Sequence, residues 1–160
     1  MYIRPNLILA VLTVAWPLAG CGHLQNTSDV LEPVQIIHRY SGEDTGLTEL
    51  GVMLVNSHEE LQTLASQELI QHEIDFEEHS LIVLALGRQS TGGYWAKITS
   101  AQQSNRELFV QGIANAPAPD AMTSQAETFV YDAVVIDKVS AGIELRPEID
   151  ASEGELMPAD

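Results

Sequence analysis

The sequence predicts a mainly β (α+β) domain, a small β-sandwich or open barrel of about six or seven strands with one short helix near 57–66. Three observations support this prediction. Short runs rich in β-branched and aromatic residues recur along the chain, turn-prone residues separate them, and one segment alone shows clear helical spacing. Many short strands of this kind are typical of sheets that pack on each other or curl into a barrel.

The helix prediction depends on its first turn. Ser57 can cap the helix, and Glu60 can complete a capping box three residues later. Leu61, Leu64 and Ala65 then share one face at helical spacing. We expect this helix to end at 66–69, which makes it short.

The most apolar strand is expected at residues 81–86, bounded by Ser80 and Gly87. A continuous apolar run is typical of a central strand covered on both faces. Residues 94–98 alternate instead, so we expect residues 81–98 to form a β-hairpin with a longer loop. Further strands are expected at 34–40, 51–55, 107–113, 128–137 and 143–145, with a long loop at 114–127.

The first twenty residues are predicted to be a signal peptide. One cation, Arg4, precedes an apolar run at 7–16, which is shorter than the about 20 apolar residues that span a bilayer. Leu18-Ala19-Gly20-Cys21 follows and resembles the lipobox of bacterial lipoproteins. The resemblance implies cleavage before Cys21, lipidation of its thiol and a lipid-anchored place in the cell envelope. Gly22 favours the outer membrane in a cell that has one. The alternatives are an ordinary signal peptide with a stray cysteine, or an uncleaved membrane anchor.

The remaining chain divides by composition into a flexible tether at 21–33, one domain at 34–147 and an acidic tail at 148–160. The formal net charge of the whole chain is -16, and it becomes -17 once Arg4 is lost (-16 minus 1). Such a charge repels nucleic acid and anionic lipid head groups, so we expect no nucleic-acid partner. Cys21 is the single cysteine, which excludes an intramolecular disulfide.

A family resemblance surrounds the apolar strand. Asp75-Phe76 precedes it, Thr91-Gly92-Gly93-Tyr94 follows it, and Thr128-Phe129-Val130-Tyr131 comes after a proline-containing loop. These features resemble the C-terminal domain of the protease complex subunit PrcB family, over about residues 75–139. The resemblance implies a lipoprotein domain that serves as an accessory or interaction module. Its expected partners are an exported protease or another envelope protein, and the membrane through Cys21.

The candidate binding loop consists of five residues: Thr91, Gly92, Gly93, Tyr94 and Trp95. Paired glycines permit a close backbone approach, and Tyr and Trp are favoured at binding hot spots. The alternative is a tight structural loop, with Tyr94 in the core and Trp95 covering the sheet. Tyr94 shares a face with Ala96 and Ile98, which favours the structural role for Tyr94 and leaves both roles open for Trp95.

The same loop has a fainter likeness to the chagasin-like inhibitors of cysteine proteases. Those proteins present a Thr-Gly-Tyr loop followed, after one residue, by Trp, and a second loop with Arg-Pro-Trp. Here the first loop has an extra glycine and lacks the spacer, and Arg146-Pro147 precedes Glu148. A cysteine-protease inhibitor is therefore an alternative function, and a structural envelope lipoprotein is another.

Motifs for catalysis are not found in the sequence. The five histidines form no His-Glu-x-x-His or His-x-His pattern, so neither a metal site nor a cofactor is predicted: His23, His38, His58, His72 and His79. Ser90 lacks the preceding glycine of a nucleophile elbow, and its loop lacks the lysine of a phosphate loop. We therefore expect a protein that is not an enzyme.

Overall fold

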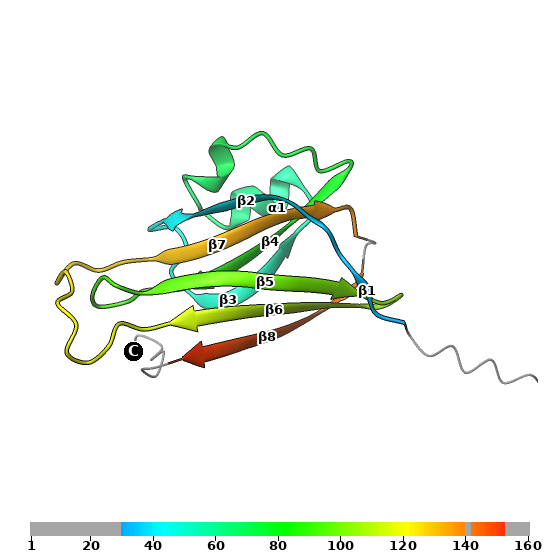
Figure 1. The fold of residues 1–160 in the computed structure, drawn as a ribbon. Helices are drawn as coiled ribbons and strands as arrows, with labels where there is room; N and C mark the ends of the chain where they lie inside the picture. The colour runs from blue at the N-terminus through cyan, green and yellow to red at the C-terminus, as the bar shows by residue number, and fades with distance from the viewer. Residues whose placement is uncertain (1–29, 140–141, 153–160) are drawn as a thin grey trace, which may run out of the picture.

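The computed structural model describes residues 30–139 and 142–152, which form two four-stranded sheets packed face to face (Figure 1). We call the first the exposed sheet. Its strands, in spatial order, are β1 (Glu32–Pro33), β5 (Trp95–Gln103), β6 (Glu107–Asn115) and β8 (Glu144–Ser152). We call the second the central sheet. Its strands, in spatial order, are β2 (Ile36–Glu43), β7 (Val130–Asp137), β4 (His79–Leu86) and β3 (Leu50–Val55).

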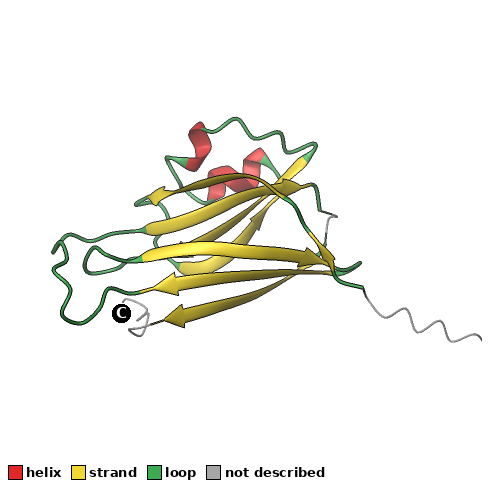
Figure 2. Ribbon diagram, viewed as in Figure 1, coloured by secondary structure: helices red, strands yellow, loops and turns green. Residues whose placement is uncertain are grey.

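A helical segment covers the second face of the central sheet. It contains α1 (His58–Thr63) and the 3-10 turn η1 (Leu69–Gln71), which lie over that sheet in Figure 2. The predicted cap of α1 is present, because the Ser57 hydroxyl accepts a hydrogen bond from the Glu60 N–H at 3.1 Å. The Glu60 carboxylate accepts from the Asn56 N–H at 2.6 Å. The helix ends earlier than expected, and Ala65 has a φ of 54°, which helical geometry does not allow.

Two apolar cores result from these three layers. One lies between the sheets and includes Ile82, Leu84, Ile98, Leu108 and Ile136. The other lies between the central sheet and the helical segment and includes Leu61, Leu69, Phe76, Leu81 and Val83. Alternate residues of β4 therefore enter different cores, which explains why the whole strand is apolar.

The structure confirms the mainly β prediction as an open sandwich, with eight strands among the described residues and no closed barrel. The predicted hairpin at 81–98 is wrong. β4 pairs with β3 on one side and β7 on the other, so it has no free edge for β5. The chain instead crosses to the exposed sheet, where β5 pairs with β6.

The predicted domain limits also differ from the structure. Residues 148–152, expected in an acidic tail, belong to β8, which runs parallel to β6 from Glu144 to Ser152. Acidic residues alternate there with Leu145 and Ile149, which pack on the core, so the strand is stable despite its charge. Glu32 and Pro33, expected in the tether, pair with β5. The predicted signal peptide, Cys21 and residues 153–160 lie outside the described residues.

Candidate interaction site

Two loops lie together at one end of the sandwich, and β1 lies at the opposite end (Figure 1). Residues 87–94 connect β4 to β5, and residues 116–129 connect β6 to β7. Of the predicted binding loop, Thr91 to Tyr94 belong to the first of them, and Trp95 is the first residue of β5. We call this end the loop end.

Hydrogen bonds hold the two loops against each other. Gln89 and Thr128 exchange backbone hydrogen bonds of 2.9 and 3.0 Å. The Thr128 hydroxyl also donates to the Thr91 carbonyl at 2.8 Å, and the Gly92 N–H donates to the Ser124 carbonyl at 3.0 Å. Gln89 is buried, and its side chain donates to the Leu86 carbonyl at 2.7 Å. The binding loop is therefore fastened to a segment almost forty residues away in the sequence.

The paired glycines are explained by this close contact between the loops. Gly93 has a φ of 93°, a conformation that other residues rarely adopt. A Cβ atom on Gly93 would lie 3.0 Å from the Pro117 Cβ, and one on Gly92 would lie 2.5 Å from the Ser124 Oγ. The close packing of the two loops is therefore enough to explain why both positions are glycine, and the paired glycines are not by themselves evidence of binding.

The side chains after the glycines differ in exposure. Tyr94 is half-buried, whereas Trp95 at the start of β5 is 45% exposed. Met122, in the second loop, is fully exposed. The loop end therefore presents large apolar side chains to solvent from a framework held by hydrogen bonds. Sequence reasoning found Trp95 but missed Met122, because a methionine in a long loop carries no local signal.

A partly buried ion pair between β2 and β7 of the central sheet also contacts the backbone of β5 in the exposed sheet. The Asp132 carboxylate of β7 accepts hydrogen bonds from the Arg39 guanidinium and from the Ile98 N–H, the latter at 2.6 Å. Arg39 also donates to the Ile98 carbonyl at 2.7 Å. The pairing of β5 with β6 shifts register between Ile98 and Ser100, so these side chains satisfy backbone groups at a β-bulge. All of these partners are structural, which argues against a catalytic role for Asp132.

A second buried carboxylate, Asp44, holds the segment between β2 and η1. It accepts hydrogen bonds from the Ser66 hydroxyl at 2.6 Å and from the backbone N–H groups of Glu68 and Gly46 at 2.8 and 2.9 Å. Burial by itself would raise the pKa of the Asp44 carboxyl, but these hydrogen bonds outweigh burial and lower the pKa below its usual value. Burial, and next the Glu68 charge, raise the pKa of the nearby Tyr131 phenol. Asp44 is thus an ionised structural acceptor, and Tyr131 stays neutral.

No group of three or more potential metal ligands is found among residues 30–139 and 142–152. The imidazole of His72 stacks on Tyr40 with ring centroids 3.8 Å apart. The rings of His58 and Phe76 form a T-shaped pair with centroids 4.9 Å apart. His23 lies outside these ranges. Among the helices that the structure describes, none is long and apolar enough to cross a membrane.

The two segments that resemble chagasin-like inhibitors lie in different kinds of structure. Thr91 to Trp95 lies at the loop end, whereas Arg146 and Pro147 lie within β8. Arg146 forms ion pairs with Glu107 and Glu144 at 3.0 and 3.1 Å. Arg146 and Pro147 therefore do not form the second loop that an inhibitory wedge of this type would need.

Comparison with known proteins identifies one segment of the chain. The chain matches no curated protein and no solved structure. Residues 80–137 match the family model described as PrcB C-terminal. This range runs from β4 to β7, so it contains the two middle strands of each sheet and both loops of the loop end. The resemblance predicted from the sequence is thus confirmed, and residues 80–137 carry the PrcB C-terminal domain signature.

Proposed function

We propose that this chain is a lipid-anchored, non-catalytic accessory module that binds another exported protein, such as a protease, through its loop end. The observation that carries the proposal is Trp95, which is 45% exposed at the start of β5, next to a loop that backbone hydrogen bonds hold in place. The PrcB C-terminal match over residues 80–137 supports an association with a protease complex.

The geometry of the loop end suits protein recognition. An exposed tryptophan offers a large apolar area together with an N–H donor, and such residues dominate the binding energy of many interfaces. A loop that is already ordered loses little conformational entropy when it binds. Met122 adds a flexible apolar side chain from the neighbouring loop, which can adapt to the surface of a partner.

The predicted lipid anchor would leave the loop end free to bind a partner. β1 lies at the end of the sandwich opposite to the loop end (Figure 1). A lipid on Cys21 would therefore attach the domain from the β1 side and direct Trp95 away from the membrane. This part of the proposal rests on the sequence Leu18-Ala19-Gly20-Cys21.

Cross-linking in cells tests the partner. The lipidated protein is cross-linked, purified from envelope extracts and compared with Trp95→Ala and Ile70→Ala variants. Ile70 is a matched control, because it is 44% exposed but lies on η1. We expect a specific envelope protein to be captured by the wild type and the control, and to be reduced at least about tenfold with Trp95→Ala, in the range of a hot-spot loss. Equal capture by all three proteins would contradict the role of Trp95.

Intact mass tests the anchor separately. Protein extracted from membranes is compared with a Cys21→Ser variant. We expect an acylated N-terminus at Cys21 in the wild type and an unacylated protein in the variant. A wild-type mass without acyl groups would refute the anchor but would leave the loop-end interaction to be judged by cross-linking.

A further inference from the structure

Four strands form the edges of the two sheets that the structure describes, and three of them have features that hinder pairing with another chain. β1 has two residues, one of which is Pro33, β2 has a register shift between Ile36 and His38, and β8 contains Pro147 and four charged residues. β3 has none of these features, because Leu50–Val55 is uncharged, lacks proline and pairs with β4 without a register shift. β3 is thus a flat, apolar edge of the kind that accepts an added strand.

Half of the backbone groups of β3 lack a partner strand in the part of the chain that the structure describes. The Lys138 N–H donates to the Glu78 carbonyl at 2.9 Å, directly beyond the pairing of β7 with β4. Even-numbered residues of β4 therefore bond to β7 and odd-numbered ones bond to β3. Each odd-numbered residue of β4 lies opposite an odd-numbered residue of β3. The outward N–H and C=O groups of β3 consequently belong to its even-numbered residues: Leu50, Val52 and Leu54.

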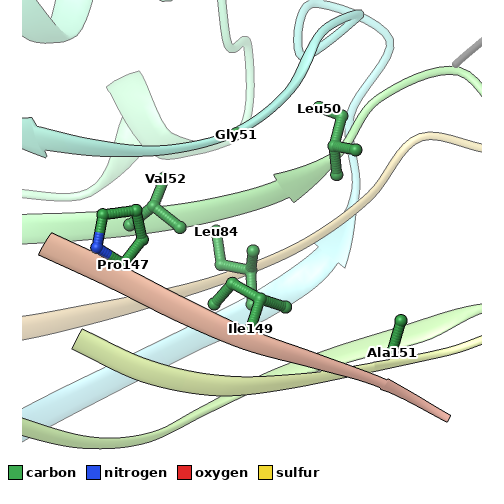
Figure 3. A pocket seen from close by; sticks show the side chains of 7 residues that line it. All are labelled: Leu50, Gly51, Val52, Leu84, Pro147, Ile149 and Ala151. Atoms are coloured by element: carbon green, nitrogen blue, oxygen red, sulfur yellow. The ribbon is translucent and has the colours of Figure 1, made fainter. Parts of the chain in front are cut away.

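An apolar groove of about 480 Å³ opens beside this edge, between β3 and β8 (Figure 3). Leu50 and Val52 line it from β3, Leu84 lines it from β4, and Ile149 lines it from β8. All of its lining residues are apolar or glycine, and Leu50 is 49% exposed. Alternate side chains of a strand added to β3 would enter this groove and cover apolar surface that now contacts water.

A second hollow, with a volume of about 290 Å³, lies on the opposite face of β3. Met53, the C-terminal end of α1 and the residues before β3 line it. Gly51 faces the same side, and a Cβ atom on it would meet no other atom within 4 Å. An added strand therefore has room for its side chains on both faces. A free strand edge with pockets for alternate side chains is the arrangement by which peptides bind as added strands.

Carboxylates at both ends of β3 determine which strand fits. Glu49 precedes β3, is exposed and has no ion pair among the described residues. Glu60 lies at the other end, where its carboxylate accepts from the Asn56 N–H at 2.6 Å. Neither lysine nor arginine lines the groove or the second hollow. We propose that the free edge of β3 binds an extended segment of another protein, in which apolar residues alternate with Lys or Arg.

A cationic partner strand fits this edge better than a second copy of the chain. The formal net charge of -16 makes two copies repel each other, and pairing of β3 with β3 would bring the carboxylates of both copies close together. The inference goes beyond the proposed function, because it concerns a different surface and does not depend on Trp95.

The test uses the full chain and three blocked synthetic peptides of about seven residues, which match the length of β3. Lys and Val alternate in the first, Glu replaces Lys in the second, and the third has the Lys and Val residues in two separate blocks. Calorimetry measures binding, and nuclear magnetic resonance follows the hydrogen exchange of backbone amides. Light scattering gives the oligomeric state without peptide.

We expect the alternating Lys peptide to bind at least about tenfold more tightly than the other two peptides. It should also slow the exchange of the Leu50, Val52 and Leu54 amides at least about tenfold. Equal affinity for the three peptides, or no binding, would overturn the proposal. Slower exchange in β8 without any change in β3 would overturn it as well, as would a dimer that protects the three amides without peptide.

Two pairs of variants test the backbone and the charge separately. Val52→Pro removes an outward N–H that Val52→Ala keeps, so we expect Val52→Pro to bind the alternating Lys peptide at least about tenfold more weakly than Val52→Ala. Glu49→Lys should weaken binding at least about threefold, whereas Glu32→Lys, at an exposed position of β1, should not. Melting temperatures show that the variants are folded. Equal binding within either pair would overturn the proposal.

Discussion

The exposed sheet and the central sheet differ in how many of their faces are covered. The central sheet packs on the exposed sheet with one face and on the helical segment with the other, and its inner strands β4 and β7 are buried along nearly their whole length. The exposed sheet packs with one face only, so buried residues alternate with partly or fully exposed ones along most of β5 and β6. Substitutions on this outer face should therefore cost less stability than substitutions in β4 and β7.

The largest loss of stability is expected at Asp132, the buried carboxylate of the central sheet that also binds the backbone of the exposed sheet. Asp132→Ala leaves Arg39 and the Ile98 N–H without their buried acceptor. We expect it to lower the free energy of unfolding by about 4 kcal/mol, because a buried carboxylate that satisfies both a cation and a backbone N–H is lost. Urea unfolding measures this, with Asp137→Ala as control, because Asp137 is exposed at the end of the same strand. Similar small losses for both variants would show that the contacts of Asp132 with Arg39 and Ile98 do not stabilise the fold.

A core substitution in the central sheet should cost almost as much. Leu81 is 0% exposed in the core beneath the helical segment, so Leu81→Ala should lower the free energy of unfolding by about 3 kcal/mol. Ile113 lies on the outer face of the exposed sheet, where it is partly exposed, and Ile113→Ala should cost less than about 1 kcal/mol. Both are measured by urea unfolding. Equal costs would mean that the outer face of the exposed sheet is also covered.

The third prediction concerns Asp44 and depends on pH. Because its pKa in the folded protein is lowered from 3.8, the ionised group stabilises the fold above about pH 4, and this contribution is lost as the pH falls through the lowered pKa. We expect Asp44→Asn to cost about 2 kcal/mol at pH 7, from weakened hydrogen bonds to a charged group. The difference from the wild type should shrink below pH 4. Unfolding at several pH values checks this, and a constant difference down to pH 2 would contradict it.

A smaller, local effect is expected in the loop end. Gly93→Ala places a side chain at a φ of 93° and within 3.1 Å of Pro117 and Thr123. We expect a loss of about 1 to 2 kcal/mol in unfolding free energy, from backbone strain and crowding. Ser90→Ala is the control, since Ser90 is exposed in the same loop. An unchanged stability would show that the two loops are not held as closely as described.

The smallest effect should come from the candidate binding residue itself. Trp95 is 45% exposed at the edge of the solvent-facing layer, so Trp95→Ala should change the free energy of unfolding by less than about 0.5 kcal/mol. Thermal and urea unfolding measure it. A loss of several kcal/mol would assign Trp95 to the core and remove the reason to consider it a recognition residue.

The difference in burial between the two sheets could be predicted from the sequence. The apolar run of β4 showed that both of its faces are covered, and the alternation in β5 showed which residues turn inward. The cap at Ser57 located the helix, and the motif around Thr91 to Tyr94 led to the PrcB resemblance that the family match confirms. All of these signals come from residues close together in the chain.

The errors involve partners that lie far apart in the chain. The false hairpin at 81–98 arose because two consecutive strands were assumed to pair, although β4 already had two partners. The charged residues of 148–152 suggested a tail, yet parallel pairing with β6 makes them a strand. No local pattern indicated that the second loop forms hydrogen bonds with the first through Ser124 and Thr128, or that it exposes Met122.

The sequence alone thus determined the burial of the faces of β4 and β5, the start of the helix and the likeness to the PrcB family. The tertiary structure alone decided which sheet each strand joins, how the two loops of the loop end are held together, and that Asp132 joins the sheets. The physical reason is that a residue's own neighbours in the chain set its turn, cap or periodicity. The hydrogen-bond partners of a strand edge, or of a buried carboxylate such as Asp132, come from distant segments of the chain. No local sequence pattern specifies them.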